Sequence, residues 1–181
     1  LDAVAYRQAV QALAKECAIG YRFLNETELE KLGAGAFLAV SQGNPTRDAG
    51  IIHLQYRPGG QTKADLALVG KGILFDTGGT NLNPFKGMLD MHMDVQGSAV
   101  ALGSLIALAK LKVPYAVDAW LAVTENRISG EAYKSQDIVR AANGTTIQVI
   151  HTDAEGRMVL ADALAIAARE RPGLIIDYAT L

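Results

Sequence analysis

Apolar residues recur at helical spacing in some parts of the chain and form short unbroken runs in others. The helical spacing predicts helices over residues 2–18, 25–32 and 96–111, and a last helix that ends near Arg169. The unbroken runs predict strands over residues 36–40, 50–56, 66–73, 115–123, 138–142, 146–150 and 174–179. This alternation predicts an α/β fold, with a mixed, mostly parallel sheet sandwiched between helices. The mixed character follows from Asn143-Gly144, which predicts a hairpin.

Composition narrows the class of protein. The 181 residues are 50% hydrophobic and 20% charged, with a formal net charge of -2, which is typical of a globular domain. Nucleic-acid binding is not expected, because the chain has no basic run to neutralise phosphates. No apolar run reaches the roughly 18 to 20 residues of a membrane-spanning helix, so no membrane partner is expected. Cys17 is the only cysteine, which excludes an intrachain disulfide and is compatible with the cytoplasm.

The segment HTDAEGRMVLADAL (151–164) places Asp153, Glu155 and Arg157 at alternate positions before an apolar helical pattern. In an extended segment alternate side chains point to one side, so two carboxylates and a guanidinium would converge. Carboxylates that close repel each other unless a cation lies between them, which suggests a divalent metal site. The alternative is a solvated turn, in which the acidic residues favour the N-terminus of the following helix.

The segment VGKGILFDTGG (69–79) places Lys71 inside an apolar strand and Asp76 beside two glycines. Open α/β sheets collect their functional groups at such strand ends. A buried lysine must be paired, neutral or bound to something. Lys71 therefore either forms an ion pair with Asp76, reaches water at the strand end, or belongs to a binding site.

A third segment, MLDMHMDVQG (88–97), places Asp90, His92 and Asp94 at alternate positions before a helix. Several carboxylates, a lysine amine and no clustered cysteines suit divalent ions such as Mg, Mn or Zn. The chain lacks a complete P-loop, a GxSxG elbow and an HExxH pair. His53 lies in a strand without a visible partner, and we interpret it as structural.

The segments VGKGILFDTGG, MHMDVQGSA and HTDAEGR, in this order and spacing, closely resemble the catalytic domain of the leucyl aminopeptidase family. That family consists of two-zinc exopeptidases, and the match extends from about Lys31 to Leu181. The resemblance implies a three-layer architecture of the zinc-exopeptidase type. It also implies that residues 1–181 are an incomplete catalytic domain of a longer protein, because the family has an N-terminal α/β domain and continues beyond the last strand.

The resemblance implies two adjacent divalent ions, either Zn, Mn or Mg. Asp76 and Glu155 would contact both ions. Lys71 and Asp94 would complete one site, and Asp153 would complete the other. The family pattern favours Asp94 over the competing Asp90. Lys71 would have to be neutral, which requires the charge of a neighbouring metal because a free amine has a pKa of about 10.4.

The resemblance also implies an activity, the hydrolysis of N-terminal, apolar residues from peptide substrates. In the family the metals activate a water and polarise the scissile carbonyl. Arg157 would hold a bicarbonate that acts as general base, Met91 and Thr180 would line the pocket for the first side chain, and Leu181 would offer backbone contacts. A cytoplasmic homo-oligomer, a hexamer, is expected from the family alone.

Two residues depart from the family pattern. Asn83 stands where the family has a second active-site lysine that binds substrate and stabilises the oxyanion, and loss of such a donor costs on the order of 10² to 10³ in turnover. Lys86, three residues later, is a candidate substitute. His151 replaces an asparagine and either alters the surroundings of the metals or remains a packed imidazole. The alternative function is therefore a catalytically impaired family member that acts as a peptide-binding or scaffold subunit.

Overall fold

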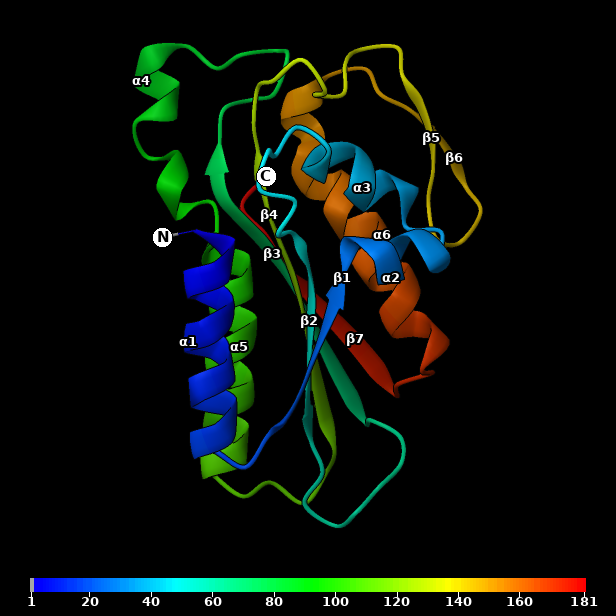
Figure 1. Ribbon diagram of the computed structural model, residues 1–181. Coiled ribbons are helices and arrows are strands. Elements are labelled where there is room, and N and C mark those ends of the chain that lie inside the picture. Colours follow the sequence, from blue (N-terminus) through cyan, green and yellow to red (C-terminus); the bar gives the residue numbers. More distant parts are fainter. Residues whose placement is uncertain (1) are drawn as a thin grey trace.

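The computed structural model describes residues 2–181 as three layers, with a central sheet between two layers of helices (Figure 1). Within these residues five strands form the sheet, in the order β1-β2-β4-β3-β7. Their bounds are β1 Gly20–Asn25, β2 Gly50–Tyr56, β3 Leu66–Asp76, β4 Val117–Asn126 and β7 Leu174–Tyr178. The predicted fold class, a mixed sheet sandwiched between helices, is confirmed.

Two helical layers cover the sheet. Helices α1 (Ala3–Glu16) and α5 (Gln96–Lys110) lie on one face, and α2 (Glu26–Lys31), α3 (Gly35–Ser41) and α6 (Glu155–Arg169) lie on the other (Figure 1). A short helix α4 (Phe85–Met88) and the 3-10 helix η1 (Met91–Met93) follow the end of β3. No helix in the described part of the chain has both the length and the apolar character needed to span a bilayer.

The origin of the mixed sheet differs from the prediction. The hairpin at Asn143-Gly144 forms, but its strands β5 (Ile138–Arg140) and β6 (Thr146–Gln148) make a separate two-stranded sheet. In the main sheet, β1 pairs antiparallel with β2 and β2 antiparallel with β4, whereas β3 pairs parallel with both β4 and β7. Strand β1, which was not predicted, therefore supplies part of the antiparallel character.

The prediction of a strand over residues 36–40 is wrong, because this segment is helix α3. A short buried apolar run has the same hydrophobicity pattern in a helix and in a strand, so periodicity alone cannot separate them. The carboxylate of Asp162 in α6 accepts a hydrogen bond of 2.8 Å from the backbone N–H of Phe37 in the first turn of α3. This tertiary contact satisfies a donor that the helix leaves free, and it stabilises the helical form.

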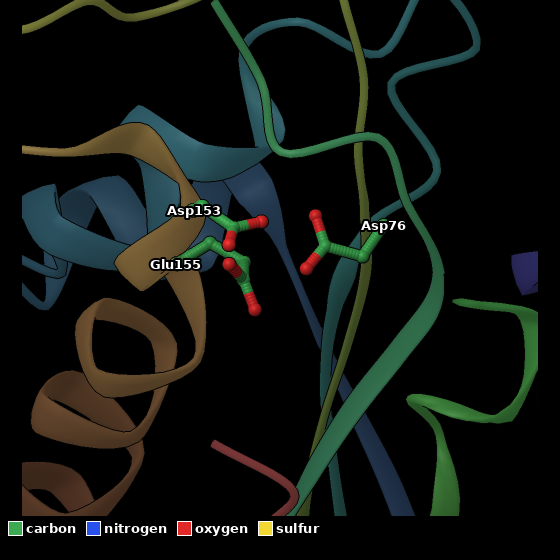
Figure 2. Close-up of side chains that lie close together, drawn as sticks. All are labelled: Asp76, Asp153 and Glu155. Carbon is green, nitrogen blue, oxygen red and sulfur yellow. The ribbon is translucent and has the colours of Figure 1, made fainter. Parts of the chain in front are cut away.

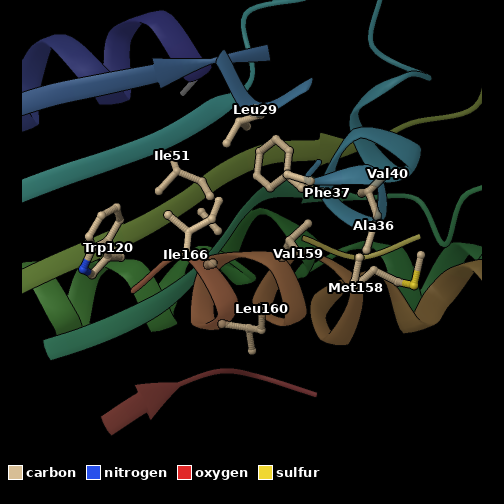
Figure 3. Packing of buried hydrophobic residues seen from close by; sticks show 14 of the residues in the cluster. Leu29, Ala36, Phe37, Val40, Ile51, Trp120, Met158, Val159, Leu160 and Ile166 are labelled. Atoms are coloured by element: carbon tan, nitrogen blue, oxygen red, sulfur yellow. The ribbon is translucent and has the colours of Figure 1, made fainter. Parts of the chain in front are cut away.

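A hydrophobic cluster joins α3 and α6 to the sheet (Figure 3). Phe37 of α3, Ile51 of β2 and Val159 of α6 are fully buried in it. Burial of one such side chain contributes roughly 1.5–3 kcal/mol. The start of α6 is therefore held against the sheet by its own apolar face, and this contact fixes the residues at its N-terminus.

His53 belongs to a buried polar cluster on β2 and β4, as its structural interpretation predicts. Its ring stacks on Trp120 with centroids 3.6 Å apart, and its Nε2 lies 3.2 Å from Oδ2 of Asp118. Arg57 Nη1 lies 2.7 Å from the other oxygen of Asp118. Burial alone would raise the pKa of Asp118, but the hydrogen bonds and charges of His53 and Arg57 outweigh it and lower the pKa.

Candidate metal centre

Three carboxylates converge at the carboxyl end of the central strands (Figure 2). Asp76 is the last residue of β3, Asp153 lies in the 3-10 helix η2 (Thr152–Ala154), and Glu155 is the first residue of α6. Each side chain offers one oxygen, and these oxygens lie within 4.8 Å of one another. Oxygens at this separation can share a divalent cation, since calcium- or zinc-type ions bind carboxylates at about 2.0–2.6 Å.

The local geometry of this motif differs from the predicted extended segment. Asp153 and Glu155 lie on a 3-10 turn that leads directly into α6, so strand alternation is not what brings them together. They meet because the turn before the helix places Asp153 beside the buried first residue of the helix. Glu155 also occupies the helix N-terminus that the alternative interpretation assigned to it, yet it is only 1% exposed.

Lys71 lies beside the carboxylates of Asp94 and Glu155 and is 3% exposed. Its Nζ lies 2.9 and 2.7 Å from the two oxygens of Asp94 and 2.9 Å from Oε1 of Glu155. It also donates a hydrogen bond of 2.7 Å to the carbonyl oxygen of Thr180. The predicted alternatives of a pair with Asp76 and of an amine that reaches water are therefore wrong.

The electrostatics of the cluster favour an added cation. Burial and the neighbouring Asp76 raise the pKa of Glu155 to about 7, despite the opposing effect of Lys71. Burial also raises the pKa of Asp76, and Asp153 adds to this effect. Burial opposes the charge on Lys71, but Glu155 and Asp94 outweigh it, so the pKa of the amine is raised. Negative charge thus exceeds what one ammonium group balances.

One buried oxygen also points to a cation. Oε2 of Glu155 is buried and has no hydrogen-bond partner among residues 2–181. An unpaired buried carboxylate oxygen is costly, and a metal ion would satisfy it. Together with the three converging carboxylates, this oxygen shows that the residues present fit a divalent metal site.

Of the acidic residues in the segment 88–97, Asp94 lies in the carboxylate cluster and Asp90 lies outside it. Asp94 is 7% exposed, pairs with Lys71 and accepts a short hydrogen bond from the hydroxyl of Thr180. Asp90 and His92 are exposed. The segment is not extended either, because Met91–Met93 form the 3-10 helix η1. Of the two competing acids, Asp94 is the one that contacts another candidate ligand.

A cavity of about 250 Å³ adjoins the carboxylates. Arg157 is exposed, whereas Met91 and Asn83 are partly buried. The cavity brings together every site residue that the sequence predicts, and its lining includes Lys71, Asp76, Asn83, Met91, Asp94, Asp153, Glu155, Arg157, Thr180 and Leu181. The placement of these residues is thus consistent with one site, while their individual roles stay predictions.

Sequence reasoning missed a buried polar network behind the carboxylates. Nδ2 of Asn126, at the end of β4, donates to Oδ1 of Asp76 at 2.8 Å and to the carbonyl oxygen of Thr152 at 3.0 Å. The hydroxyl of Tyr133 donates to the same carbonyl at 2.6 Å. Asn126 thereby ties the end of β3 to η2. The signal available in the sequence was a polar residue at the carboxyl end of a strand.

The two residues that depart from the family pattern contact Asp153. Nδ2 of Asn83 donates a hydrogen bond of 2.7 Å to Oδ1 of Asp153. Nδ1 of His151 accepts a hydrogen bond of 3.2 Å from the backbone N–H of Asp153 and so caps η2. His151 is exposed, so the prediction of a packed imidazole is wrong. Lys86 is also exposed and does not line the cavity.

The profile of the cytosol aminopeptidase family, catalytic domain, matches residues 1–181. Because this match covers the whole chain, the chain belongs to that family. The predicted resemblance to the aminopeptidases is thereby confirmed.

Individual relatives agree with the family assignment. The chain is 44% identical over 176 residues to a probable cytosol aminopeptidase of Leifsonia xyli subsp. xyli (strain CTCB07), covering 97% of this chain and 35% of that protein. It is 42% identical over 183 residues to a probable cytosol aminopeptidase of Sulfurihydrogenibium sp. (strain YO3AOP1), covering 100% of this chain and 36% of that protein. The chain therefore spans about a third of the length of these relatives.

A solved structure has the same fold. The crystal structure of cytosol aminopeptidase from Coxiella burnetii superposes with a TM-score of 0.92 at 36% sequence identity. The superposition covers 99% of this chain and 38% of that chain. The three-layer arrangement is therefore shared with an experimentally determined member of the family.

Proposed function

We propose that this chain is the metal-binding part of an aminopeptidase that removes N-terminal residues from peptides. The observation that carries the proposal is the convergence of Asp76, Asp153 and Glu155, whose oxygens lie within 4.8 Å of one another beside a cavity. Membership of the cytosol aminopeptidase family supports the reaction class. Because the chain spans about a third of its relatives, the activity is proposed for the full-length protein.

Five residues would hold two divalent ions, with Asp76 and Glu155 shared between them. The family resemblance assigns Lys71 and Asp94 to one ion and Asp153 to the other. The ions, either Zn, Mn or Mg, would supply an activated water and Lewis-acid polarisation of the scissile carbonyl. Lys71 must lose its proton to act as a ligand, and the carboxylates that now surround its ammonium group would turn to the metals.

The remaining residues of the cavity would bind and orient the substrate. Met91 and Thr180 lie at its wall and would form the pocket for the first side chain, and Leu181 would offer backbone contacts. The apolar side chain of Met91 supports a preference for an apolar first residue. Arg157 is accessible at the same wall, and its guanidinium would hold a bicarbonate, which would supply a general base there. A homohexamer, the assembly that the family resemblance implies, is proposed for the full-length protein.

A second candidate function rests on Asn83. A lysine at this position would supply a positive charge to the oxyanion, whereas the amide of Asn83 is engaged by Asp153. A weakly active or inactive subunit that binds metal and peptide is therefore the competing proposal. It predicts metal loading without turnover.

Steady-state hydrolysis of leucine p-nitroanilide by the full-length protein, with Mn²⁺ or Zn²⁺ added, separates the two proposals. We expect turnover that depends on the metal and two bound ions per chain. Bound metal without turnover, with turnover restored by Asn83→Lys, would favour the inactive subunit. Fewer than about 0.2 equivalents of bound metal after loading would contradict both proposals. Sedimentation velocity of the same sample tests the hexamer.

A further inference from the structure

We infer that Asn83 is a positioning residue for the metal ligand Asp153. The amide of Asn83 would then hold the Asp153 carboxylate in place for one of the two ions, in a role distinct from that of an oxyanion donor. The inference rests on the proposed metal centre and concerns Asp153, whose side chain has a single hydrogen bond within residues 2–181.

The four acidic ligands differ in how they are oriented. Asp76 accepts hydrogen bonds from Asn126 and from the backbone N–H of Gly78. Asp94 and Glu155 both contact Lys71. Within residues 2–181, the side chain of Asp153 has one hydrogen bond, the contact of 2.7 Å with Asn83. Removal of Asn83 would therefore free the Asp153 carboxylate from its only side-chain restraint.

The backbone holds Asn83 in place for this contact. Its N–H donates a hydrogen bond of 2.8 Å to the carbonyl oxygen of Thr77, which closes the loop after β3. Thr77 is itself held at the end of β4, because its N–H and its hydroxyl both donate hydrogen bonds to the carbonyl oxygen of Asn126. The following Pro84 restricts the backbone of Asn83 to extended conformations. The amide is thus presented from a loop that is anchored to the sheet.

The amide suits this role because it donates without adding charge. A carboxylate has about four lone-pair sites, so Asp153 can accept the amide hydrogen and still bind an ion. Partners that orient a metal ligand are typically worth 10- to 100-fold in metal affinity.

Titration of the full-length protein with Mn²⁺ tests the inference without measuring activity. Isothermal calorimetry gives the two affinities, and the six-line EPR signal of free Mn²⁺ gives the unbound ion. We expect Asn83→Ala to weaken one of the two ions about 10- to 100-fold and to leave the other unchanged. The control Lys86→Ala, in the same exposed segment, should bind both ions as the wild type does.

A double-mutant cycle assigns the effect to Asp153. Asp153→Ala should remove the weakened ion, and Asn83→Ala added to it should change nothing further. If Asn83→Ala is unfolded by circular dichroism, Asn83→Leu keeps the volume without the donor and takes its place. A folded Asn83 variant that binds both ions with wild-type affinity would overturn the inference and leave the metal centre standing. A wild type that fails to bind two ions would instead contradict the proposed function.

Discussion

The substitution Gly156→Ala measures how firmly the amine of Lys71 is fixed. Gly156 is the second residue of α6, and a Cβ added there would lie 2.7 Å from Cε and 2.9 Å from Nζ of Lys71. Contacting carbon atoms are normally about 3.5–4.0 Å apart. Lys71 would therefore have to move, although its ammonium group is held by Asp94, Glu155 and the carbonyl of Thr180.

The expected change in the free energy of unfolding is the sum of two opposing effects. Overpacking at a buried site costs about 1–3 kcal/mol. Replacing glycine by alanine within a helix gains up to about 1 kcal/mol. Gly103 in α5 supplies the matched control, because an added Cβ there meets no atom within 4 Å among residues 2–181. Gly103→Ala should therefore show the gain alone, and Gly156→Ala should unfold with a free energy about 1–3 kcal/mol lower than the control.

Thermal unfolding by circular dichroism and Mn²⁺ titration check this expectation. For a domain of this size, about 2–4 °C of melting temperature corresponds to each kcal/mol, so the two variants should differ by about 2–12 °C. Gly156→Ala should also bind Mn²⁺ more weakly, because a displaced amine can no longer serve as the proposed ligand of one ion. Equal melting temperatures together with unchanged Mn²⁺ affinity would refute the tight fit of Lys71 against α6.

Three further predictions concern charge and burial. Metal affinity should rise with pH through about 7, because Glu155, whose pKa is raised to about 7, must ionise to bind. Metal binding should release more protons below about pH 7 than above it, since Glu155 adds its proton to the one that Lys71 loses. Calorimetry in buffers of different ionisation enthalpy would show equal release on both sides of about pH 7 if this is wrong. Asp118→Asn should make the free energy of unfolding less dependent on pH in acid. A carboxyl of lowered pKa stabilises the fold above about pH 4, and this stabilisation is lost as pH falls through its folded pKa. Urea unfolding between about pH 3 and 6 measures this dependence, and parallel curves for the variant and the wild type would contradict the prediction. Asn126→Ala should lower the free energy of unfolding by about 1–3 kcal/mol, because it removes the hydrogen bonds that Asn126 donates to Asp76 and to the carbonyl oxygen of Thr152. An unchanged urea midpoint would show that these hydrogen bonds do not stabilise the fold.

The sequence predicted the candidate site more completely than the local geometry that builds it. Lys71 and Asp76 could be placed together because parallel strands carry polar residues to one edge of a sheet. The partners of Lys71 could not be predicted from spacing, because Asp94 and Glu155 approach it from separate helical segments. The same limit applies to the contact between Asn83 and Asp153, which joins two loops that are distant in the chain.

The errors in the fold have a related cause. Residues 36–40 were predicted as a strand, and the helix there depends on Asp162, which lies on another element. The hairpin at Asn143-Gly144 was predicted correctly. Its two strands lie outside the main sheet, because the strands of that sheet pair with one another and not with β5 or β6. Local patterns thus identified the apolar segments, while contacts between distant elements decided their form and position.

The position of Lys71 has a consequence for the order in which the protein is made. Lys71 lies in β3, and its partners Asp94, Glu155 and Thr180 all come later in the chain. A buried ammonium group without partners costs several kcal/mol. During synthesis, β3 therefore gains little from closing against the helices until α6 has left the ribosome. We therefore expect the core around Lys71 to close only after the acidic residues have been translated.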